Sequence, residues 1–285
     1  MHDSVAGKLQ KLRGRLASFS SVLVAYSGGV DSTLLAYHAH AVLGDRMKAV
    51  IVASPLLPPR ELERAKSVAA SLGFPLEVVE ADELSLPAFA SNPPDRCYTC
   101  KRFRLELLRD MAVREGWEAV LEGSNLDDAG AHRPGRRASA ELGTSSPLED
   151  AGLSKDDIRS LAREAGLPNW DAPSRPCLAT RFPYGMALER ELVLRVDAAE
   201  EALEGLGLRQ VRVRLDAPDT ARIEAGADES AVLEEKDKRE SAVKKLRGLG
   251  FRRIMLDLEG YRSGSMDESS PARNCRTLYD ADENA

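Results

Sequence analysis

The sequence predicts an α/β protein in which a parallel-sheet domain is followed by a smaller α+β domain. Short apolar runs, typical of buried parallel strands, alternate with helical patterns between residues 22 and 123. A turn containing two glycines joins the first apolar run to the helical pattern after it. Beyond residue 185 the pattern changes to alternating strands and charged helices. We therefore expect domains at residues 1–185 and 186–266 and a disordered polar tail at 267–285.

Composition excludes several classes of function. A chain of 285 residues has room for about two domains. Its net charge of −6 argues against the basic face that nonspecific nucleic-acid binding needs. It contains no apolar run of about 18 residues and no signal-peptide core near its start, so we expect a cytoplasmic protein without a membrane partner. The four cysteines are then expected to be chemical or metal-binding rather than disulfide-forming.

The first domain is expected to alternate strands with helices, so that right-handed crossovers build a parallel sheet. The predicted strands are residues 22–26, 48–53, 76–80 and 119–123, and the predicted helices are residues 5–20, 30 onwards, 59–72, 101–115 and 158–165. Pro59 and Gly73 are typical first and closing residues of a helix, and Ser154 with Asp157 resembles a capping box. Residues 91–100, with a Cys-x-x-Cys pattern, and the basic residues 132–137 are predicted to be loops. Ligands of such sheets bind at the carboxyl ends of the strands.

The second domain follows a loop at residues 170–185 that contains three prolines and no periodicity. Its predicted helices are residues 188–206 and 229–248, and its predicted strands are residues 210–215, 220–224 and 253–257. This order of elements predicts a small α+β domain.

The turn after the first strand, Ser27-Gly-Gly-Val-Asp-Ser-Thr33, is the strongest functional signal in the chain. A strand, a glycine turn and a helix start direct backbone N–H groups and the positive helix end at one spot, where an anion binds. Gly28 and Gly29 permit the tight turn, and Ser27 and Ser32 add hydroxyl groups. The loop has no lysine, so it is not a GxxxxGK(S/T) phosphate loop. Asp31 stands where phosphate would bind, which is consistent with a Mg²⁺ ion bridging the two.

This loop resembles the pyrophosphate loop of the N-type ATP pyrophosphatases, the PP-loop enzymes, which split ATP into AMP and pyrophosphate. The resemblance implies ATP and Mg²⁺ as ligands. Asp127 and Asp128, at the carboxyl end of the fourth strand, are expected to contact Mg²⁺ or the ribose, and Gly123 is expected to contact the nucleotide. Lys101, directly after the Cys-x-x-Cys pattern, is expected to neutralise the departing pyrophosphate.

The cysteines are the second functional signal. Cys177 lies between Arg175 and Arg181, whose charges favour a thiolate, and is therefore a candidate nucleophile for an acyl carbon. Cys97 and Cys100 leave three interpretations open: half of a zinc site, a redox pair, or two ligands that join Cys177 on one iron–sulfur cluster. Cys275, in the polar tail, is expected to be incidental.

Over residues 5–267 the chain resembles the pyridinium-3,5-biscarboxylic acid mononucleotide sulfurtransferases, the LarE family. The motifs that carry this resemblance are SGGVDST at 27–33, NPPDRCYTCK at 92–101, RPGRRA at 133–138, CLATRFPYG at 177–185, VRVR and ARIE between 211 and 224, and LDLEGYRSG at 256–264. The resemblance implies that ATP adenylates a substrate carboxylate and that Cys177 then attacks the acyl-adenylate and displaces AMP. The thiocarboxylate product belongs to the biosynthesis of the nickel-pincer cofactor of lactate racemase.

The family divides by the source of its sulfur. Some members sacrifice the sulfur of the cysteine that matches Cys177, whereas others have three cysteines that hold a 4Fe-4S cluster. Cys97, Cys100 and Cys177 make this chain similar to the second type. The resemblance also implies that the protein forms a homo-oligomer, commonly a hexamer, through its second domain. Further active-site residues that it implies are Arg212 and Arg214 for the substrate phosphate, together with Thr180 (serine in other members), Arg181, Glu200 and Arg262.

Three other interpretations remain open. In the first, the protein is a sacrificial sulfur donor at Cys177. In the second, it is another enzyme that uses the same loop, either a tRNA thiolase or an amidotransferase-linked synthetase. In the third, it is a non-enzymatic adenine-nucleotide sensor with zinc on its Cys-x-x-Cys. The acidic charge and the lack of a glutaminase domain argue against the thiolase and the synthetase. Pyrophosphate release with the pyridinium substrate would exclude the sensor.

Overall fold

The computed structural model describes residues 4–129, 134–173, 175–262 and 265–268. The chain divides into two compact units: unit 1 comprises residues 1–83 and 97–175, and unit 2 comprises residues 84–96 and 176–285. The predicted tail therefore lies outside the described residues from 269 onwards, and so does Cys275.

The units divide between Arg175 and Pro176, not after residue 185, and a segment from the first half of the chain joins unit 2. Hydrogen bonds explain this exchange. The Gly185 amide donates to the carbonyl of Asn92 at 2.9 Å, and the Leu188 amide donates to the carbonyl of Ala90 at 2.7 Å. These bonds hold residues 84–96 to the loop at 183–188, so the segment belongs to unit 2.

Unit 1 is built on a four-stranded sheet with the order β3-β2-β1-β4. Its strands are β1 (Val22–Ala25), β2 (Met47–Ala53), β3 (Leu76–Glu80) and β4 (Ala119–Leu121). Every pair of neighbours is parallel. The predicted parallel α/β architecture is confirmed.

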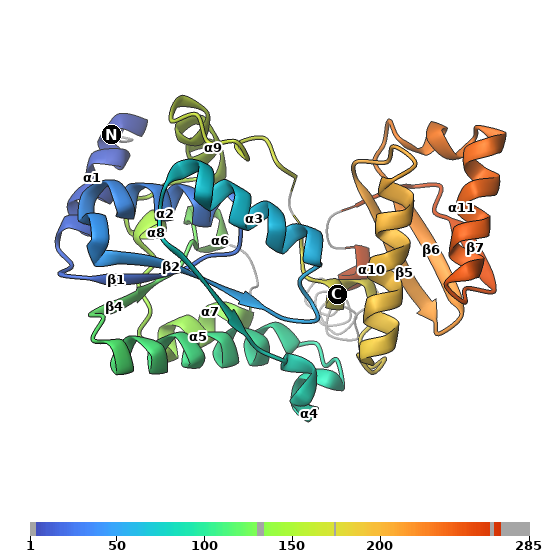
Figure 1. The fold of residues 1–285 in the computed structure, drawn as a ribbon, viewed down its shortest axis with the longest axis horizontal. Coiled ribbons are helices and arrows are strands. Elements are labelled where there is room, and N and C mark those ends of the chain that lie inside the picture. Colours follow the sequence, from blue (N-terminus) through green and yellow to red (C-terminus); the bar gives the residue numbers. More distant parts are fainter. Residues whose placement is uncertain (1–3, 130–133, 174, 263–264, 269–285) are drawn as a thin grey trace, which may run out of the picture. The chain divides into compact units, whose positions relative to one another are not determined.

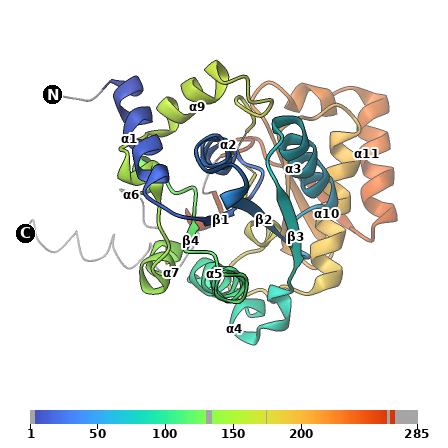
Figure 2. The ribbon, with the colours of Figure 1, turned by 60° about the vertical axis from the view of Figure 1, so that its left-hand side comes forward.

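Helices cover both faces of this sheet, as Figures 1 and 2 show. Helices α1, α2, α3 and α9 lie on one face, and α5 and α7 lie on the other. The helical elements that begin in unit 1 are α1 (Val5–Ala17), α2 (Val30–Leu43), η1 (Gly44–Arg46), α3 (Pro59–Leu72), η2 (Glu83–Ser85), α6 (Leu126–Ala129), α7 (Pro134–Leu142), α8 (Pro147–Asp150) and α9 (Lys155–Glu164). Helix α5 (Arg96–Glu115) begins with the last residue of the exchanged segment.

Two apolar clusters fill the space between sheet and helices. Val22 and Val24 of β1 pack with the α2 side, whereas Leu23 packs with Leu105 and Leu108 of α5. Successive residues of a strand point to opposite faces, so one apolar strand serves both clusters. This placement makes β1 a central strand, and the loop at its carboxyl end lies between the two helix layers.

Two predicted loops are wrong in part. Residues 96–100 form the start of α5, so the Cys-x-x-Cys lies in the first turns of a helix. One local and one long-range contact accompany that start: the buried Arg96 side chain donates to Asn92 Oδ1 at 2.8 Å and stacks on Tyr184. Residues 134–137 begin α7, with Pro134 at the first helical position, where its lack of an N–H costs nothing. Residues 132–133 lie outside the described residues.

Unit 2 is a three-stranded sheet with the order β5-β6-β7, antiparallel between β5 and β6 and parallel between β6 and β7. This matches the predicted α+β architecture, and α10 packs on β5 and on α11. The elements are α4 (Pro87–Ala90), η3 (Leu178–Arg181), α10 (Arg190–Glu204), β5 (Val211–Ala217), β6 (Thr220–Ala225), η4 (Ser230–Leu233), α11 (Lys236–Gly248), β7 (Arg253–Leu256) and α12 (Ser265–Glu268). Among the described residues of both units, no helix combines the length and apolarity that a membrane crossing requires.

Candidate functional site

The anion-binding loop between β1 and α2 is held in shape by its own polar groups. Ser32 Oγ accepts from the Ser27 amide at 3.2 Å and donates to the Gly29 carbonyl at 3.1 Å. Gly28 has a φ of +76°, and a Cβ there would lie 2.8 Å from the Cβ of Ala65. Both the backbone angle and the close approach of α3 therefore require glycine at this position. Ser27, Gly28, Gly29 and Ser32 together form the predicted loop.

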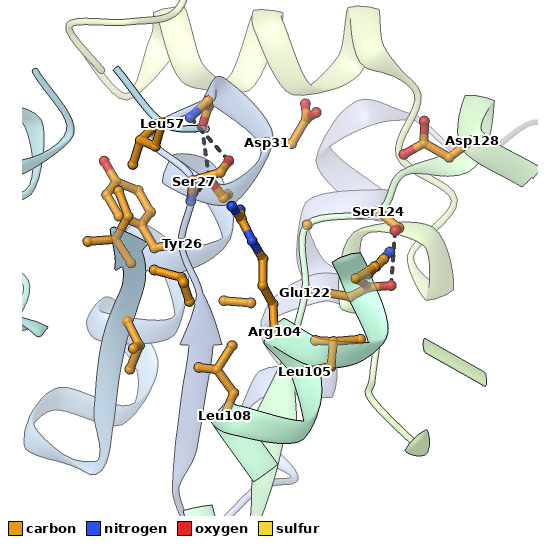
Figure 3. A pocket seen from close by; sticks show the side chains of 18 residues that line it. Tyr26, Ser27, Asp31, Leu57, Arg104, Leu105, Leu108, Glu122, Ser124 and Asp128 are labelled. Atoms are coloured by element: carbon orange, nitrogen blue, oxygen red, sulfur yellow. Dashed lines mark hydrogen bonds and ion pairs between the residues drawn. The ribbon is translucent and has the colours of Figure 1, made fainter. Parts of the chain in front are cut away.

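This loop borders a cavity of about 350 Å³ in unit 1 (Figure 3). The cavity lies at the carboxyl ends of β1, β2 and β4, where a doubly wound sheet binds its ligands. Polar lining residues include Ser27, Asp31, Ser32, Lys101, Arg104, Glu122, Ser124 and Asp128. Apolar lining residues include Val50, Val52, Leu105 and Leu108. Such a cavity suits a ligand with one charged and one apolar end.

Asp31 lies in the first turn of α2 and lines the cavity. Lys155 Nζ lies 2.7 Å from each of its carboxylate oxygens. The lysine was not singled out from the sequence, because it is 124 residues away and no local pattern connects the two. Asp128 lines the same cavity, so oxygen ligands of the kind that Mg²⁺ prefers are present there. The residues therefore fit a Mg²⁺ ion bound together with nucleotide phosphates.

The other predicted residues of unit 1 divide into two groups. Lys101 lines the cavity and pairs with the buried Glu122, whose Oε2 lies 2.6 Å from Lys101 Nζ. Gly123 also lines the cavity, and a Cβ on it would lie 3.0 Å from the Ser32 amide nitrogen. Asp127, by contrast, is exposed, and its carboxylate accepts from the Lys155 amide at 2.8 Å. Its neighbour Asp128 lines the cavity instead.

Asn169 is a second residue of the site that sequence reasoning missed. Its Nδ2 group donates to the Gly28 carbonyl and to Thr33 Oγ1, both at 2.9 Å. The Asn169 side chain thus links the loop to the segment that follows α9, which is more than 130 residues later in the sequence. A lone asparagine in a loop carries no pattern that could have predicted this contact.

In unit 2, Arg181 and Glu200 form a buried ion pair. Arg181 Nε and Nη2 donate to the two carboxylate oxygens at 2.8 and 3.0 Å, a bidentate geometry. The Val213 amide donates to the same carboxylate at 3.0 Å. Burial raises the pKa of Glu200, but the charges of Arg181 and, more weakly, Arg212 outweigh it and hold the pKa below its ordinary range. The carboxylate is therefore charged and fixed beside β5.

Arg212 and Arg214 of β5 are both buried, at 3% and 4% exposed. Arg214 Nη2 lies 2.7 Å from Glu224 Oε2, and its Nη1 donates to the Thr180 carbonyl at 2.9 Å. Arg212 lies over the ring of Tyr261 at 5.1 Å. Burying a guanidinium group on a strand costs solvation energy, and for Arg214 the ion pair with Glu224 offsets that cost. Glu224 could not be singled out from its strand pattern alone.

Cys177 lies in unit 2 at the start of η3, half-buried. Its carbonyl accepts from Thr180 Oγ1 at 2.9 Å and from Arg181 Nη1 at 3.3 Å. Both arginines expected to favour its thiolate are paired with carboxylates: Arg181 with Glu200, and Arg175, within unit 1, with Glu61 at 2.8 Å. Arg262 is also ion-paired at the surface, with Glu259.

Cys97 and Cys100 are three residues apart in α5, so they lie on one face of the helix. Cys97 is exposed and Cys100 is half-buried. Within the described parts of the chain, no three His, Cys, Asp or Glu side chains are close enough together to hold a metal ion. Two thiol ligands on one helix turn fit part of an iron–sulfur or zinc site, and the third ligand stays a prediction.

Comparison with known proteins gives several matches. The NAD synthase family model matches residues 4–96. The chain is 38% identical to the pyridinium-3,5-bisthiocarboxylic acid mononucleotide synthase of Lactiplantibacillus plantarum, over 93% of this chain and 96% of that protein. It is 40% identical to the uncharacterized protein slr1717 of Synechocystis sp., over 91% of this chain and 97% of that protein. It is 30% identical to one subunit of the glutamine-hydrolyzing GMP synthase of Pyrococcus furiosus, over 71% of this chain and 69% of that protein.

Proposed function

The chain belongs to the family of the pyridinium-3,5-bisthiocarboxylic acid mononucleotide synthases, the LarE family, and from this premise we propose that it is an ATP-dependent sulfurtransferase. Its proposed substrate is pyridinium-3,5-biscarboxylic acid mononucleotide, of which a carboxylate becomes a thiocarboxylate during nickel-pincer cofactor biosynthesis. One observation carries the proposal: the anion-binding loop, with Asp31 in it, opens into the cavity at the carboxyl edge of the parallel sheet.

Unit 1 is proposed to perform the adenylation. Backbone N–H groups and hydroxyls of residues 27–32 would bind the β- and γ-phosphates of ATP, and Asp31 would hold Mg²⁺ against them. A carboxylate oxygen of the substrate attacks the α-phosphorus, the bond to the β-phosphate oxygen breaks, and pyrophosphate leaves. Lys101, which lines the same cavity, would offset part of the charge on that leaving group.

Unit 2 is proposed to bind the substrate phosphate and to supply the thiol. Arg212 and Arg214 are buried cations on one face of a strand, which suits a phosphate monoester. In the route in which Cys177 is itself the sulfur donor, its thiolate would attack the acyl carbon, and the acyl–oxygen bond to AMP would break. Arg181 and Glu200 would keep the Cys177 loop in position, since Arg181 also donates to the Cys177 carbonyl.

A further part of the proposal concerns the origin of the sulfur that is transferred. We propose that Cys97, Cys100 and Cys177 hold a 4Fe-4S cluster, which when bound would carry the sulfide that is transferred. The two thiols on one face of α5 support this interpretation. Sacrifice of the Cys177 sulfur itself is the alternative.

The central test is release of pyrophosphate by the purified protein, given ATP, Mg²⁺ and the pyridinium substrate. Asp31→Ala is expected to abolish this release while the melting temperature and circular dichroism stay those of a folded protein, because the metal loses its ligand at the loop. Asp45→Ala is the matched control, since Asp45 is an exposed carboxylate in η1 after the same helix. Normal release by Asp31→Ala would show that the loop was assigned wrongly.

The same assay separates the other functions. Release that requires tRNA rather than the pyridinium substrate would indicate a thiolase, and ATP binding without release would indicate a sensor. Similarity to the GMP synthase supports a synthetase as an alternative function. That match, however, has lower identity and lower coverage than the match to the pyridinium mononucleotide synthase.

We also propose that the protein forms a homo-oligomer through unit 2. The edge strand β7 and the turn after it expose apolar side chains, namely Met255, Leu256 and Leu258, of which Leu258 is 96% exposed. An exposed sheet edge with apolar side chains is a surface on which another chain can pair. Sedimentation velocity of the full chain measures the oligomer number, and a monomer at all concentrations would contradict the proposal.

A further inference from the structure

Arg104 on α5 reaches into the cavity of unit 1 from the apolar side (Figure 3). Its guanidinium points toward Ser27 of the anion-binding loop and away from Leu108. The side chain is 30% exposed, so part of it meets the cavity and part is covered. Neither its position in the helix nor the motifs of the sequence indicated a role for it.

Two polar groups hold the guanidinium in this orientation. Its Nε group donates to Glu83 Oε1, and its Nη2 group donates to Ser54 Oγ at 3.0 Å. Glu83 is completely buried, at 0% exposed. A carboxylate in that environment requires a cationic partner, and the same pairing fixes the direction of the arginine side chain. The ion pair therefore gives the cavity a positive group whose direction is fixed.

The lining of the cavity is ordered from polar to apolar. The loop residues Ser27 and Ser32 form its anion-binding end, and Val50, Val52, Leu105 and Leu108 form its apolar part. ATP has the same order, with pyrophosphate at one end, the base at the other and the α-phosphate between them. When the loop holds the pyrophosphate and the base packs on the apolar part, the α-phosphate would lie between them, in the part of the cavity where the Arg104 side chain extends from the side of Leu108 toward Ser27 (Figure 3).

We propose that Arg104 is a phosphate-binding residue that contacts the α-phosphate of ATP and, after pyrophosphate has left, the phosphate of the acyl-adenylate. This inference rests on the proposed function, since it takes the cavity to be the adenylation site. A guanidinium forms charge-assisted hydrogen bonds to phosphate oxygens and stabilises the charge that develops there during displacement. The contacts of the loop with pyrophosphate would end when adenylation is complete. The contact of Arg104 with the α-phosphate would last until AMP is displaced.

The test compares AMP with adenosine, which differ only in the phosphate that Arg104 is proposed to bind. Isothermal titration of the full-length protein should show tighter binding of AMP than of adenosine. Arg104→Ala should weaken AMP binding about tenfold to a hundredfold, the range for a hydrogen bond to a charged group. Adenosine binding should stay unchanged. Arg102→Ala is the matched control on the same helix, since Arg102 pairs with Glu106 at 2.8 Å and does not line the cavity.

A second variant protects the test against a loss of folding. Arg104→Ala leaves the carboxylate of Glu83 buried without its partner, which destabilises the protein. The double variant Glu83→Gln with Arg104→Met removes both charges, and it should show the same selective loss of AMP binding. Unfolding transitions of both variants confirm that folded protein was titrated.

The outcomes decide between three roles for Arg104. Selective loss of AMP affinity supports the phosphate contact. An equal loss for AMP and adenosine would assign Arg104 to the base or to the shape of the cavity, and unchanged AMP affinity would make it a structural ion pair; either result overturns the proposal, as does equal binding of both ligands by the wild type. The titrations need no pyridinium substrate, so a failure of the proposed sulfurtransferase activity would be seen separately, as absent pyrophosphate release.

Discussion

At the scale of single residues, the pairing of Asp31 with Lys155 is the main finding. The ammonium lies 2.7 Å from both carboxylate oxygens, which are the atoms proposed to hold Mg²⁺. One carboxylate cannot hold both cations in this geometry, so lysine and metal compete for it. The Lys155 side chain is 35% exposed and the Asp31 side chain is 24% exposed. An ion pair in this environment contributes only about 0.2–1 kcal/mol to stability. The lysine is therefore a weak competitor that ATP-bound magnesium can displace.

The competition predicts that Lys155→Met binds Mg²⁺ more tightly than the wild type in the absence of nucleotide. The increase should be at most about fivefold, because a pair worth no more than about 1 kcal/mol is removed. Isothermal titration with magnesium chloride measures it. Lys8→Met is the control, since it breaks a similarly short pair with Asp157, at 2.6 Å, away from the cavity. Unchanged or weaker Mg²⁺ binding by Lys155→Met would show that lysine and metal do not share this carboxylate.

At the scale of elements, α2 performs two functions that place different demands on its sequence. Its first turn carries the loop and Asp31, whose negative charge is favourable at a helix N-terminus. Its interior is buried against β1 and α1, and it includes a histidine, His38, that is 2% exposed. Burial, with a smaller contribution from the charge of Arg13, lowers the pKa of His38 from 6.5 to about 4. The helix therefore buries a neutral imidazole at physiological pH.

This burial predicts that acid weakens the fold through His38. The unfolded chain takes up a proton near pH 6.5, whereas the folded chain does so only near pH 4. Stability is therefore complete above the unfolded pKa and falls as the pH drops toward the folded one. Between pH 7 and pH 5 the wild type should lose about 2 kcal/mol of unfolding free energy through this group. Urea unfolding at both pH values checks this.

The comparison that isolates the effect is His38→Gln, which keeps a polar side chain of similar size but cannot titrate. Its unfolding free energy should depend less on pH than that of the wild type over the same interval. His40→Gln, two residues along the same helix and only partly buried, serves as the control. Equal pH dependence in wild type and His38→Gln would refute the assignment.

At the scale of the whole molecule, the candidate chemistry is divided between the two units. The anion-binding loop, Lys101 and the Cys-x-x-Cys belong to unit 1, whereas Cys177 and the buried arginines belong to unit 2. Iron binding tests the proposed role of the three cysteines, Cys97, Cys100 and Cys177.

Anaerobically reconstituted wild-type protein is expected to carry about four irons per chain, as a cubane cluster needs. Each of the single variants Cys97→Ala, Cys100→Ala and Cys177→Ala should lose the iron. The variant Cys275→Ala, at a position outside the described residues, should keep it. Iron analysis and the absorption spectrum measure both. The sacrificial route predicts a different product, a chain that is lighter by one H₂S with dehydroalanine at position 177. That mass loss, found in protein that binds no iron, would contradict the cluster.

Much of the fold and part of the site follow from the sequence alone. Apolar runs separated by helical patterns predicted the parallel sheet, and Ser154 with Asp157 predicted a capping box that the structure confirms. The loop at residues 27–33 also predicted the place of the cavity. These successes share a cause: each signal depends on residues within a few positions of one another, where backbone geometry and helix or strand period act.

Contacts between distant residues were decided by the tertiary structure. Lys155 on Asp31, Asn169 on Gly28 and Glu83 behind Arg104 each join segments with no shared pattern. A distant contact also lies at the wrongly predicted loop of the Cys-x-x-Cys, because Arg96, the first residue of α5, stacks on Tyr184. A sequence specifies which charged groups exist, but burial selects the partner of each, since a buried charge must be neutralised by whichever opposite charge the fold brings to it.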